Sequence, residues 1–408
     1  MEAKKKKKIA IEDYLYIVVA VCMTFTITER IPVVGRPWVV GPLGVLLGLR
    51  FVKIRGWINI FAVLAVYGLV VFLNFFSGDT YFDSAVMVAY ELMYLFVPFT
   101  MFLYFQRVPQ SANLLKTIFI FFLIECTAVS VYADSVFPGL IRMQSNGDSI
   151  REYWSLLGPF RRMGLSSYGL PHAIPVFIPA LVYIIKRQTG KHRWGGVILL
   201  LTSLSLVYVS NSSTALILSL IVTPMSFFVS GKRGNSVLLL FVIVMPLVLN
   251  QTVQVKVLES LSSLTQNNSL FETKRIDIEE SIMYGEVQGG VAVRQSLYAA
   301  SFEAFFENPI MGVNDKKYGG HSALLDRLAM LGFLGFLPLS LLFYRIYKFT
   351  LKCLPKESRV YYKMGFLVGI IMLSAKNMFG WAMFFFMFFL LPMLIILQDY
   401  NKSTSEIQ

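Results

Sequence analysis

The stretch Phe379-Gly-Trp-Ala-Met-Phe-Phe-Phe-Met-Phe-Phe-Leu-Leu-Pro-Met-Leu-Ile-Ile-Leu-Gln398 contains no charged residue over 20 positions. A helix of about 20 apolar residues crosses the roughly 30 Å hydrocarbon core of a bilayer, so this segment predicts a membrane-spanning helix. Eleven similar stretches precede it, at residues 12–28, 37–53, 57–76, 83–105, 115–133, 171–186, 195–210, 213–230, 236–253, 322–345 and 360–376. The sequence therefore predicts an all-α, polytopic membrane protein with about twelve transmembrane helices.

The overall composition agrees with this interpretation and excludes several classes of protein. Of the 408 residues, 56% are hydrophobic and only 15% are charged, and the mean hydropathy is +0.63. A typical soluble chain has about 25% charged residues. The same values exclude disordered, collagen-like and small disulfide-stabilised secreted proteins. We interpret the formal net charge of +13 as a sign of membrane orientation and expect no nucleic-acid partner.

The basic residues are distributed unevenly among the loops between the predicted helices. If the N-terminus is cytoplasmic, the cytoplasmic regions hold 23 of the 37 Lys and Arg residues and six acidic residues, a net charge of +17. The remainder of the chain holds 14 basic and 18 acidic residues, a net charge of −4. Because cytoplasmic loops are enriched in Lys and Arg, this distribution predicts a multi-pass membrane protein with both termini in the cytoplasm. The family resemblance described below implies that this membrane is a bacterial cytoplasmic (inner) membrane.

Residues 1–408 are expected to form one integral membrane domain with two large extracytoplasmic loops, 134–170 and 254–321. Both loops are rich in Ser, Asn, Gly and charged residues, and both are too short to be independent domains. The second loop precedes the tenth predicted helix and contains a predicted surface helix from Arg294 to Glu307. Its Tyr298, Phe302 and Phe305 follow an i, i+4, i+7 pattern, which predicts an apolar face at the membrane interface.

The outer loops contain several arginine residues, although the positive-inside rule predicts few Lys and Arg residues on that side. These arginine residues are Arg142, Arg151, Arg161 and Arg162 in the first loop and Arg275 and Arg294 in the second. A guanidinium group binds phosphate through two parallel hydrogen bonds and stays charged at any working pH. The set therefore predicts an anion-binding site. For each single arginine, the alternative is an ion pair with an acidic residue of the same loops.

Few other residues carry a chemical signal. Glu91 and Glu125 lie within predicted helices, where a carboxylate is a candidate proton or cation site unless it pairs with a nearby hydroxyl or arginine. His321 follows Gly319-Gly320 and directly precedes a predicted helix, where it is a candidate general base or a helix-capping residue. The three His and three Cys residues are too scattered for a zinc or redox site, so we expect no metal and no cofactor.

Two stretches of this sequence resemble the O-antigen polymerase and ligase superfamily. The first is Val293-Arg294-Gln-Ser-Leu-Tyr-Ala-Ala-Ser-Phe-Glu-Ala-Phe-Phe-Glu-Asn308-Pro309-Ile-Met-Gly312, followed by His321-Ser322 and by Leu331-Gly332-Phe-Leu-Gly335. It is similar to the family's loop helix, which opens with Arg and closes with Asn/His-Pro-x-x-Gly before a His and a Leu-Gly-x-x-Gly helix. The second and weaker stretch is Arg162-Met-Gly164 with Pro171-His172. Together they cover about a fifth of the chain.

The resemblance implies an extracytoplasmic glycosyltransferase that needs neither nucleotide nor metal. Its donor would be a glycan on a polyprenyl diphosphate. Arg294 would hold the diphosphate, His321 would deprotonate the attacking sugar hydroxyl, and Arg161, Arg162 and Arg142 would share the binding of the anion. The implied partners are the lipid-linked donor and acceptor, membrane lipid, and chain-length regulator or flippase proteins.

The chain departs from the family at one place. The family commonly has a Ser-Arg or Thr-Arg pair where a helix turns near the outer surface, and this chain has Ser210-Asn211-Ser212 there. Either Arg161 and Arg162 replace the missing arginine, or another position corresponds to it.

Three classes of function remain open from the sequence: a glycan polymerase or ligase, a transporter or flippase, and a membrane scaffold. We favour a polymerase of surface polysaccharide, an O-antigen or capsule, because polymerases are the larger group, over a ligase that transfers glycan to a lipid A core. A transporter or flippase would require charged residues along the interior of the helices, and a membrane scaffold would give no reason for Arg294 and His321 to lie together. A shared catalytic site requires Arg162, Arg294 and His321 within about 15 Å of one another, around one outward-facing cavity.

Overall fold

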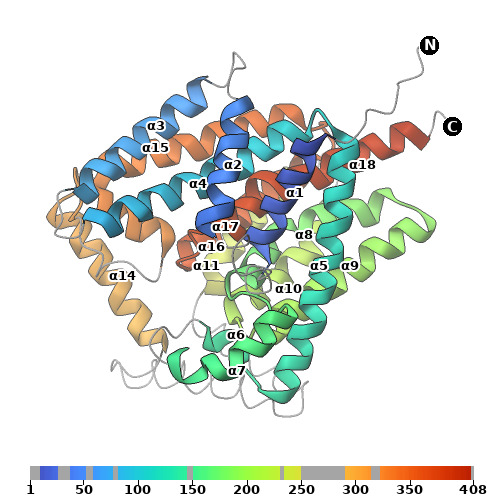
Figure 1. The fold of residues 1–408 in the computed structure, drawn as a ribbon, viewed down its shortest axis with the longest axis horizontal. Coiled ribbons are helices and arrows are strands. Elements are labelled where there is room, and N and C mark those ends of the chain that lie inside the picture. The colour runs from blue at the N-terminus through green and yellow to red at the C-terminus, as the bar shows by residue number, and fades with distance from the viewer. Residues whose placement is uncertain are drawn as a thin grey trace.

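A computed structural model of the chain describes residues 10–25, 37–51, 58–76, 81–144, 150–229, 234–249, 290–313 and 322–405. Every regular element within these residues is a helix, and they contain no strand (Figure 1). The prediction of an all-α fold is therefore confirmed. Residues 145–149, 254–289 and 314–321 of the two predicted outer loops lie outside the described chain.

Each of the twelve predicted apolar stretches overlaps a described helix. These helices are α1 (Ile11–Thr24), α2 (Pro37–Phe51), α3 (Ile58–Phe76), α4 (Tyr81–Phe105), α5 (Pro109–Val136), α8 (Gly169–Arg187), α9 (Gly190–Val209), α10 (Ser213–Phe228), α11 (Gly234–Leu249), α15 (Ala323–Cys353), α16 (Arg359–Ala375) and a last continuous helix composed of α17 (Trp381–Phe384), the π-helical η5 (Phe385–Leu390) and α18 (Leu391–Ser405). The remaining elements, α6 (Leu140–Met143), α7 (Ile150–Met163) and α14 (Gly290–Glu307), belong to the predicted outer loops.

Four of the described helices are long and apolar enough to cross a membrane. They are residues 109–136, 169–187, 323–353 and 381–400, and six further apolar helices are shorter, with 10–17 residues each. Their length and composition are those expected for the helices of a membrane protein.

Hydrogen bonds at one end of the bundle join the start of α1 to the end of α4, the end of α8 to α18, and the end of α10 to the start of α16. The bonded pairs are Tyr104–Asp13, Tyr183–Asp399 (2.7 Å) and Tyr361–Val229 (2.9 Å). The C-terminal part of α18 lies at the upper right of Figure 1. We call this end the termini end, because the first helix starts and the last helix finishes here.

The opposite end joins the other ends of the same helices. Its bonded pairs are His172–Ser212 (2.7 Å), Ala323–Lys376 (3.0 Å) and Trp381–Thr24 (3.0 Å), which connect the starts of α8, α10, α15 and α17 to the ends of α16 and α1. Helices α6, α7 and α14 lie along the lower and left edges in Figure 1. We call this the loop end. These bonds place the starts of α1 and α16 with the ends of α4, α8 and α10 at the termini end, and the starts of α8, α10, α15 and α17 with the ends of α1 and α16 at the loop end.

Helix α8 forms the centre of the bundle. Every side chain from Leu170 to Tyr183 is buried, and the helix contacts α9, α10, α16 and α18. A helix that is apolar on all sides must be surrounded by other helices or by lipid. The aromatic residues of η5 complete this core, since Phe177 of α8 meets Phe386 edge to face with ring centroids 5.0 Å apart.

Helix α15 is broken at Gly332, and the segment 308–313 fills the break. Gly332 has φ 57° and ψ −163°, a conformation that is essentially restricted to glycine. The amide groups of Phe333 and Leu334 donate to the carbonyl groups of Pro309 (2.8 Å) and Ile310 (3.1 Å), and that of Val313 donates to the carbonyl of Ala329 (3.0 Å). Backbone groups that lose their partners at the break are therefore bonded by the 308–313 segment.

This contact between the 308–313 segment and the break in α15, which we call the joint, explains the two glycine motifs that follow Arg294 in the sequence. Gly312 has φ 79°, and a Cβ atom there would lie 2.2 Å from the carbonyl oxygen of Met330. A Cβ atom on Gly332 would lie 2.4 Å from the carbonyl oxygen of Ile310. The Asn-Pro-x-x-Gly and Leu-Gly-x-x-Gly motifs are therefore two halves of one backbone contact.

The predicted apolar face of the surface helix differs in the structure. Phe302 is exposed, but Phe305 is buried and its ring contacts Phe333 with centroids 5.1 Å apart. Tyr298 is half-buried and its hydroxyl donates to the carbonyl of Ala375 (2.9 Å). The exposed aromatic residues of α14 are Phe302 and Phe306, because tertiary packing against α15 turns Phe305 inward.

Gly332→Ala is expected to destabilise the protein by about 1–3 kcal/mol, because it forces a side chain into a glycine-only conformation and against a carbonyl group. The measurement is thermal unfolding in detergent. Gly195→Ala is the matched control, because a Cβ atom there meets nothing within 4 Å. Equal unfolding temperatures for Gly332→Ala and the wild type would contradict the joint as described.

Candidate functional site

Residues 375–380, which connect α16 to α17, form the point where several helices of the loop end meet. We call this the hub segment. Its Ala375 carbonyl accepts from Tyr298 of α14 (2.9 Å), and its Lys376 carbonyl accepts from the amide of Ala323 at the start of α15 (3.0 Å). The guanidinium carbon of Arg327 lies 4.6 Å from the centre of the Phe379 ring. The hub segment thus fixes the positions of α14 and α15 relative to the last helix.

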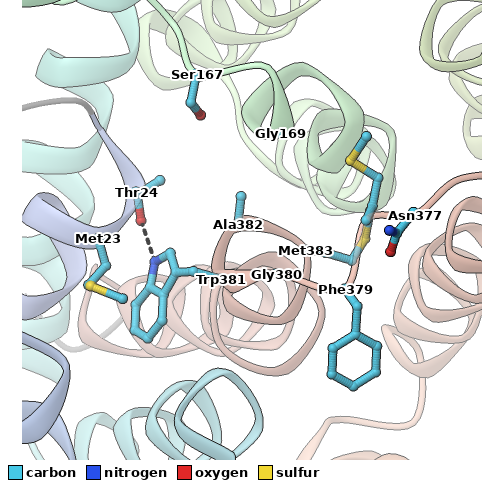
Figure 2. A pocket seen from close by; sticks show the side chains of 11 residues that line it. Met23, Thr24, Ser167, Gly169, Asn377, Phe379, Gly380, Trp381, Ala382 and Met383 are labelled. Carbon is cyan, nitrogen blue, oxygen red and sulfur yellow. Dashed lines mark hydrogen bonds between the residues drawn. The ribbon is translucent and has the colours of Figure 1, made fainter. Parts of the chain in front are cut away.

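A cavity of about 270 Å³ lies beside the hub segment. Its wall combines the end of α1, the residues before and at the start of α8, and the hub segment with the first turn of α17: Met23, Thr24, Ser167, Gly169, Asn377, Met378, Phe379, Gly380, Trp381, Ala382 and Met383. Figure 2 shows Thr24, Trp381 and Ala382 on one side of the opening and Ser167 on the other. The indole of Trp381 donates to the hydroxyl of Thr24 (3.0 Å), which holds this wall together.

Two helices begin at the wall of this cavity. Helix α8 starts at Gly169, and α17 starts at Trp381 and continues through η5 into α18. Neither N-cap residue, Tyr168 or Gly380, makes a side-chain capping hydrogen bond. First-turn amide groups carry partial positive charge and favour anions nearby. The cavity therefore combines an aromatic and methionine-rich wall with two positively polarised helix starts.

The predicted residue Arg161 is connected to this wall through a short chain of hydrogen bonds. Its Nη2 donates to Oε1 of Gln144 (3.3 Å), and the Nε2 of Gln144 donates to the carbonyl of Ser166 (2.8 Å). Ser166 precedes the cavity residue Ser167. Arg162 is exposed beside it at the end of α7.

The other predicted residues are described only in part. Arg294 lies in the first half of α14 and Arg142 lies in α6, and the side chains of both fall outside the described structure, as does all of His321. Their described neighbours are informative. Tyr298, one turn after Arg294, bonds to the hub segment, and so does Ala323, two residues after His321.

The turn at Ser210-Asn211-Ser212, between α9 and α10, belongs to a compact polar cluster. Asn211 has φ 54°, and its side-chain amide donates to Oδ1 of Asp134 (3.4 Å). The hydroxyl of Ser212 lies 2.7 Å from Nε2 of the fully buried His172, and His172 Nδ1 lies 2.9 Å from the carbonyl of Tyr168. A carbonyl only accepts, so Nδ1 carries the proton and Nε2 accepts from Ser212. This cluster fastens α8 to α10.

Glu91, one of the two acidic residues expected within the membrane, is paired. Its carboxylate accepts from the hydroxyl of Tyr67 (2.9 Å) and forms a buried ion pair with Arg327. This agrees with the alternative that an intramembrane acid pairs with a hydroxyl or an arginine. Glu125 is half-buried on α5.

The sequence predictions missed the hub segment and Arg327. Lys376-Asn377 interrupts two apolar stretches, and Asp326-Arg327 places two charges near the start of an apolar helix. Charged residues at such positions face protein or water and not lipid, which is the signal that identifies both.

Comparison of the chain with known protein families, with curated proteins and with solved structures found no match. Among the described residues, no three His, Cys, Asp or Glu residues are grouped so that they could hold a metal ion.

Replacing either member of the buried pair, by Glu91→Leu or Arg327→Met, is expected to cost about 3–5 kcal/mol because the remaining charge stays buried without compensation. The double variant is expected to be more stable than either single variant. Thermal unfolding of all three measures the coupling, and additive effects would contradict it. Arg50→Met is the control, since the Arg50–Glu12 pair is largely exposed and contributes less than about 1 kcal/mol.

Proposed function

We propose that this protein is an extracytoplasmic glycosyltransferase that polymerises repeat units carried on a polyprenyl diphosphate into a surface polysaccharide. The observation that supports the proposal is the convergence on the hub segment. Tyr298 follows Arg294 by one turn, Ala323 follows His321 by two residues, and Ser167 follows Arg162 by five. The first two bond to the hub segment, and the third lines the cavity beside it.

The chemistry of the cavity suits the donor that we propose. Transfer of a glycan from a polyprenyl diphosphate leaves a strongly negative leaving group. Fixed positive groups aimed at that charge can lower the activation barrier by several kcal/mol. In this proposal the arginines of α7 and α14 and the uncapped starts of α8 and α17 provide these positive groups. Arg294 and Arg162 bind the diphosphate directly.

The acceptor requires a base and a surface for the sugar. His321 is proposed to accept the proton of the attacking hydroxyl, since imidazole titrates near neutral pH. Thr24, Ser167 and Asn377 provide polar groups in the cavity wall for the sugar hydroxyls. In this proposal the twelve helices span the membrane, both termini are cytoplasmic, and the loop end faces outward.

His321→Ala and Arg294→Ala are each expected to reduce polymerisation about 100-fold or more, because each removes a group that acts in the transition state. The measurement is gel electrophoresis of the surface glycan from cells that carry the variant gene, with immunoblots to show equal protein in the membrane. Arg193→Ala, an exposed residue at the start of α9 and the predicted cytoplasmic side, is the control.

The glycan pattern separates the functions. Single repeat units on the lipid carrier or surface lipid indicate loss of a polymerase. Long chains that are made but not attached to the outer lipid indicate loss of a ligase instead. Unchanged long chains on the surface would overturn both functions.

Ala382→Leu is expected to reduce glycan chain length while leaving the protein folded, because the larger side chain points into the cavity (Figure 2). The matched control is Ala89→Leu, the same change at an exposed position of α4. Normal chain length in the Ala382 variant, with the protein present in the membrane, would show that the cavity does not hold the substrate.

A further inference from the structure

Exposed apolar side chains continue from α15 onto the 308–313 segment and the end of α14. On α15 the exposed residues are Phe333, Leu334 and Leu337, and beside them lie Phe306 (72% exposed), Ile310 (62%) and Met311 (48%). Helix α15 is one of the helices long and apolar enough to span a membrane, so its exposed side faces lipid. The patch on α14 and the 308–313 segment is continuous with that lipid-facing side.

The position of the contact along α15 places the 308–313 segment at membrane depth. Between Arg327 and Arg345, α15 has 17 residues without a charge, about 26 Å at 1.5 Å per residue. The segment bonds to Ala329, Phe333 and Leu334, which lie in the first part of this apolar stretch. The contact therefore begins at Ala329, about 3 Å along the helix from Arg327 toward the middle of the apolar stretch, and continues past the break at Gly332.

Several backbone polar groups of this segment are bonded within the protein, as non-helical chain in a membrane requires. Unsatisfied amide and carbonyl groups are costly in hydrocarbon, so irregular backbone occurs there only where its polar groups are bonded within the protein or face water. The amides of Gly312 and Val313 are bonded to Asn308 (2.8 Å) and Ala329 (3.0 Å), and two carbonyls of the segment fill the break in α15.

The exposed surface of helix α14 has an apolar side and, next to it, an acidic side, which we call the glutamate flank. At about 100° per residue, Phe302 and Phe306 lie on one side of the exposed surface, and Glu303 and Glu307 lie on the other. All four are exposed. Carboxylates do not face lipid tails without compensation, so the glutamate flank must be in contact with water.

We propose that α14 and the 308–313 segment form a re-entrant element in the leaflet at the loop end. Lipid acyl chains contact Phe302, Phe306, Ile310 and Met311, and water contacts Glu303 and Glu307. The element thus separates the bilayer from a water-filled region at the loop end, next to the hub segment. This inference depends only on the membrane location of α15 and is independent of the proposed reaction.

The experiment is spin-label accessibility in vesicles of phosphatidylethanolamine and phosphatidylglycerol. The native cysteines are replaced by Cys22→Ala, Cys126→Ala and Cys353→Ser, and single labels are placed by Phe306→Cys, Met311→Cys, Glu303→Cys and Glu307→Cys. Molecular oxygen probes contact with lipid, and a water-soluble nickel chelate probes contact with water. Leu337→Cys is the lipid control and Lys356→Cys, in the exposed turn after α15, is the water control.

The proposal predicts a two-sided result. The relaxation of labels at 306 and 311 should be several-fold more sensitive to oxygen than to nickel, as for the lipid control at 337. The relaxation of labels at 303 and 307 should be more sensitive to nickel, as for the water control at 356. Nickel sensitivity at 306 and 311 would show an aqueous loop and overturn the proposal. Relaxation that is more sensitive to oxygen than to nickel at 303 and 307 would show that these positions contact lipid, and would contradict the proposed contact of Glu303 and Glu307 with water. All four positions are exposed, so the substitutions leave the packed core intact.

Discussion

The attachment of α14 and α15 to the hub segment is the contact on which the arrangement of the loop end depends. Two hydrogen bonds to consecutive carbonyl groups, those of Ala375 and Lys376, hold these helices against the end of α16. Both acceptors are main-chain carbonyls without a helical partner where α16 ends, and the Lys376 carbonyl also accepts from the amide of Met378 (2.9 Å). The hub segment can perform this role because it connects α16 directly to the last helix.

The same constraint, that backbone polar groups must be bonded in an apolar environment, determines where the chain is irregular. Helix α15 breaks only at Gly332, where the 308–313 segment supplies the missing partners. The chain before α8 leaves helical geometry at Ser166, whose amide is bonded to Ser130 (3.2 Å) and whose carbonyl is bonded to Gln144 (2.8 Å). These irregular places surround the loop end, and the cavity lies among them.

Much of the architecture followed from sequence patterns. Segments of uninterrupted apolar residues predicted the helices, because a bilayer-length apolar run has few other stable conformations, and the Lys and Arg bias predicted which helix ends share a side. The site was predicted less completely. Arg161 is connected to the cavity wall through Gln144, and its role in anion binding stays a prediction. The hub segment has no sequence motif, and Arg327 could not be identified from sequence because its partner Glu91 is 236 residues away.

The sequence by itself determined the all-helical class and the positions of the apolar helices, because both depend on local hydrophobicity. Only the tertiary structure decided that Phe305 faces the protein while Phe306 faces outward, that Glu91 pairs with Arg327, and that the two glycine motifs form one joint. These depend on which helices become neighbours. In a bundle of similarly apolar helices, shape and a few buried polar contacts choose those neighbours, and hydrophobicity alone does not distinguish among them.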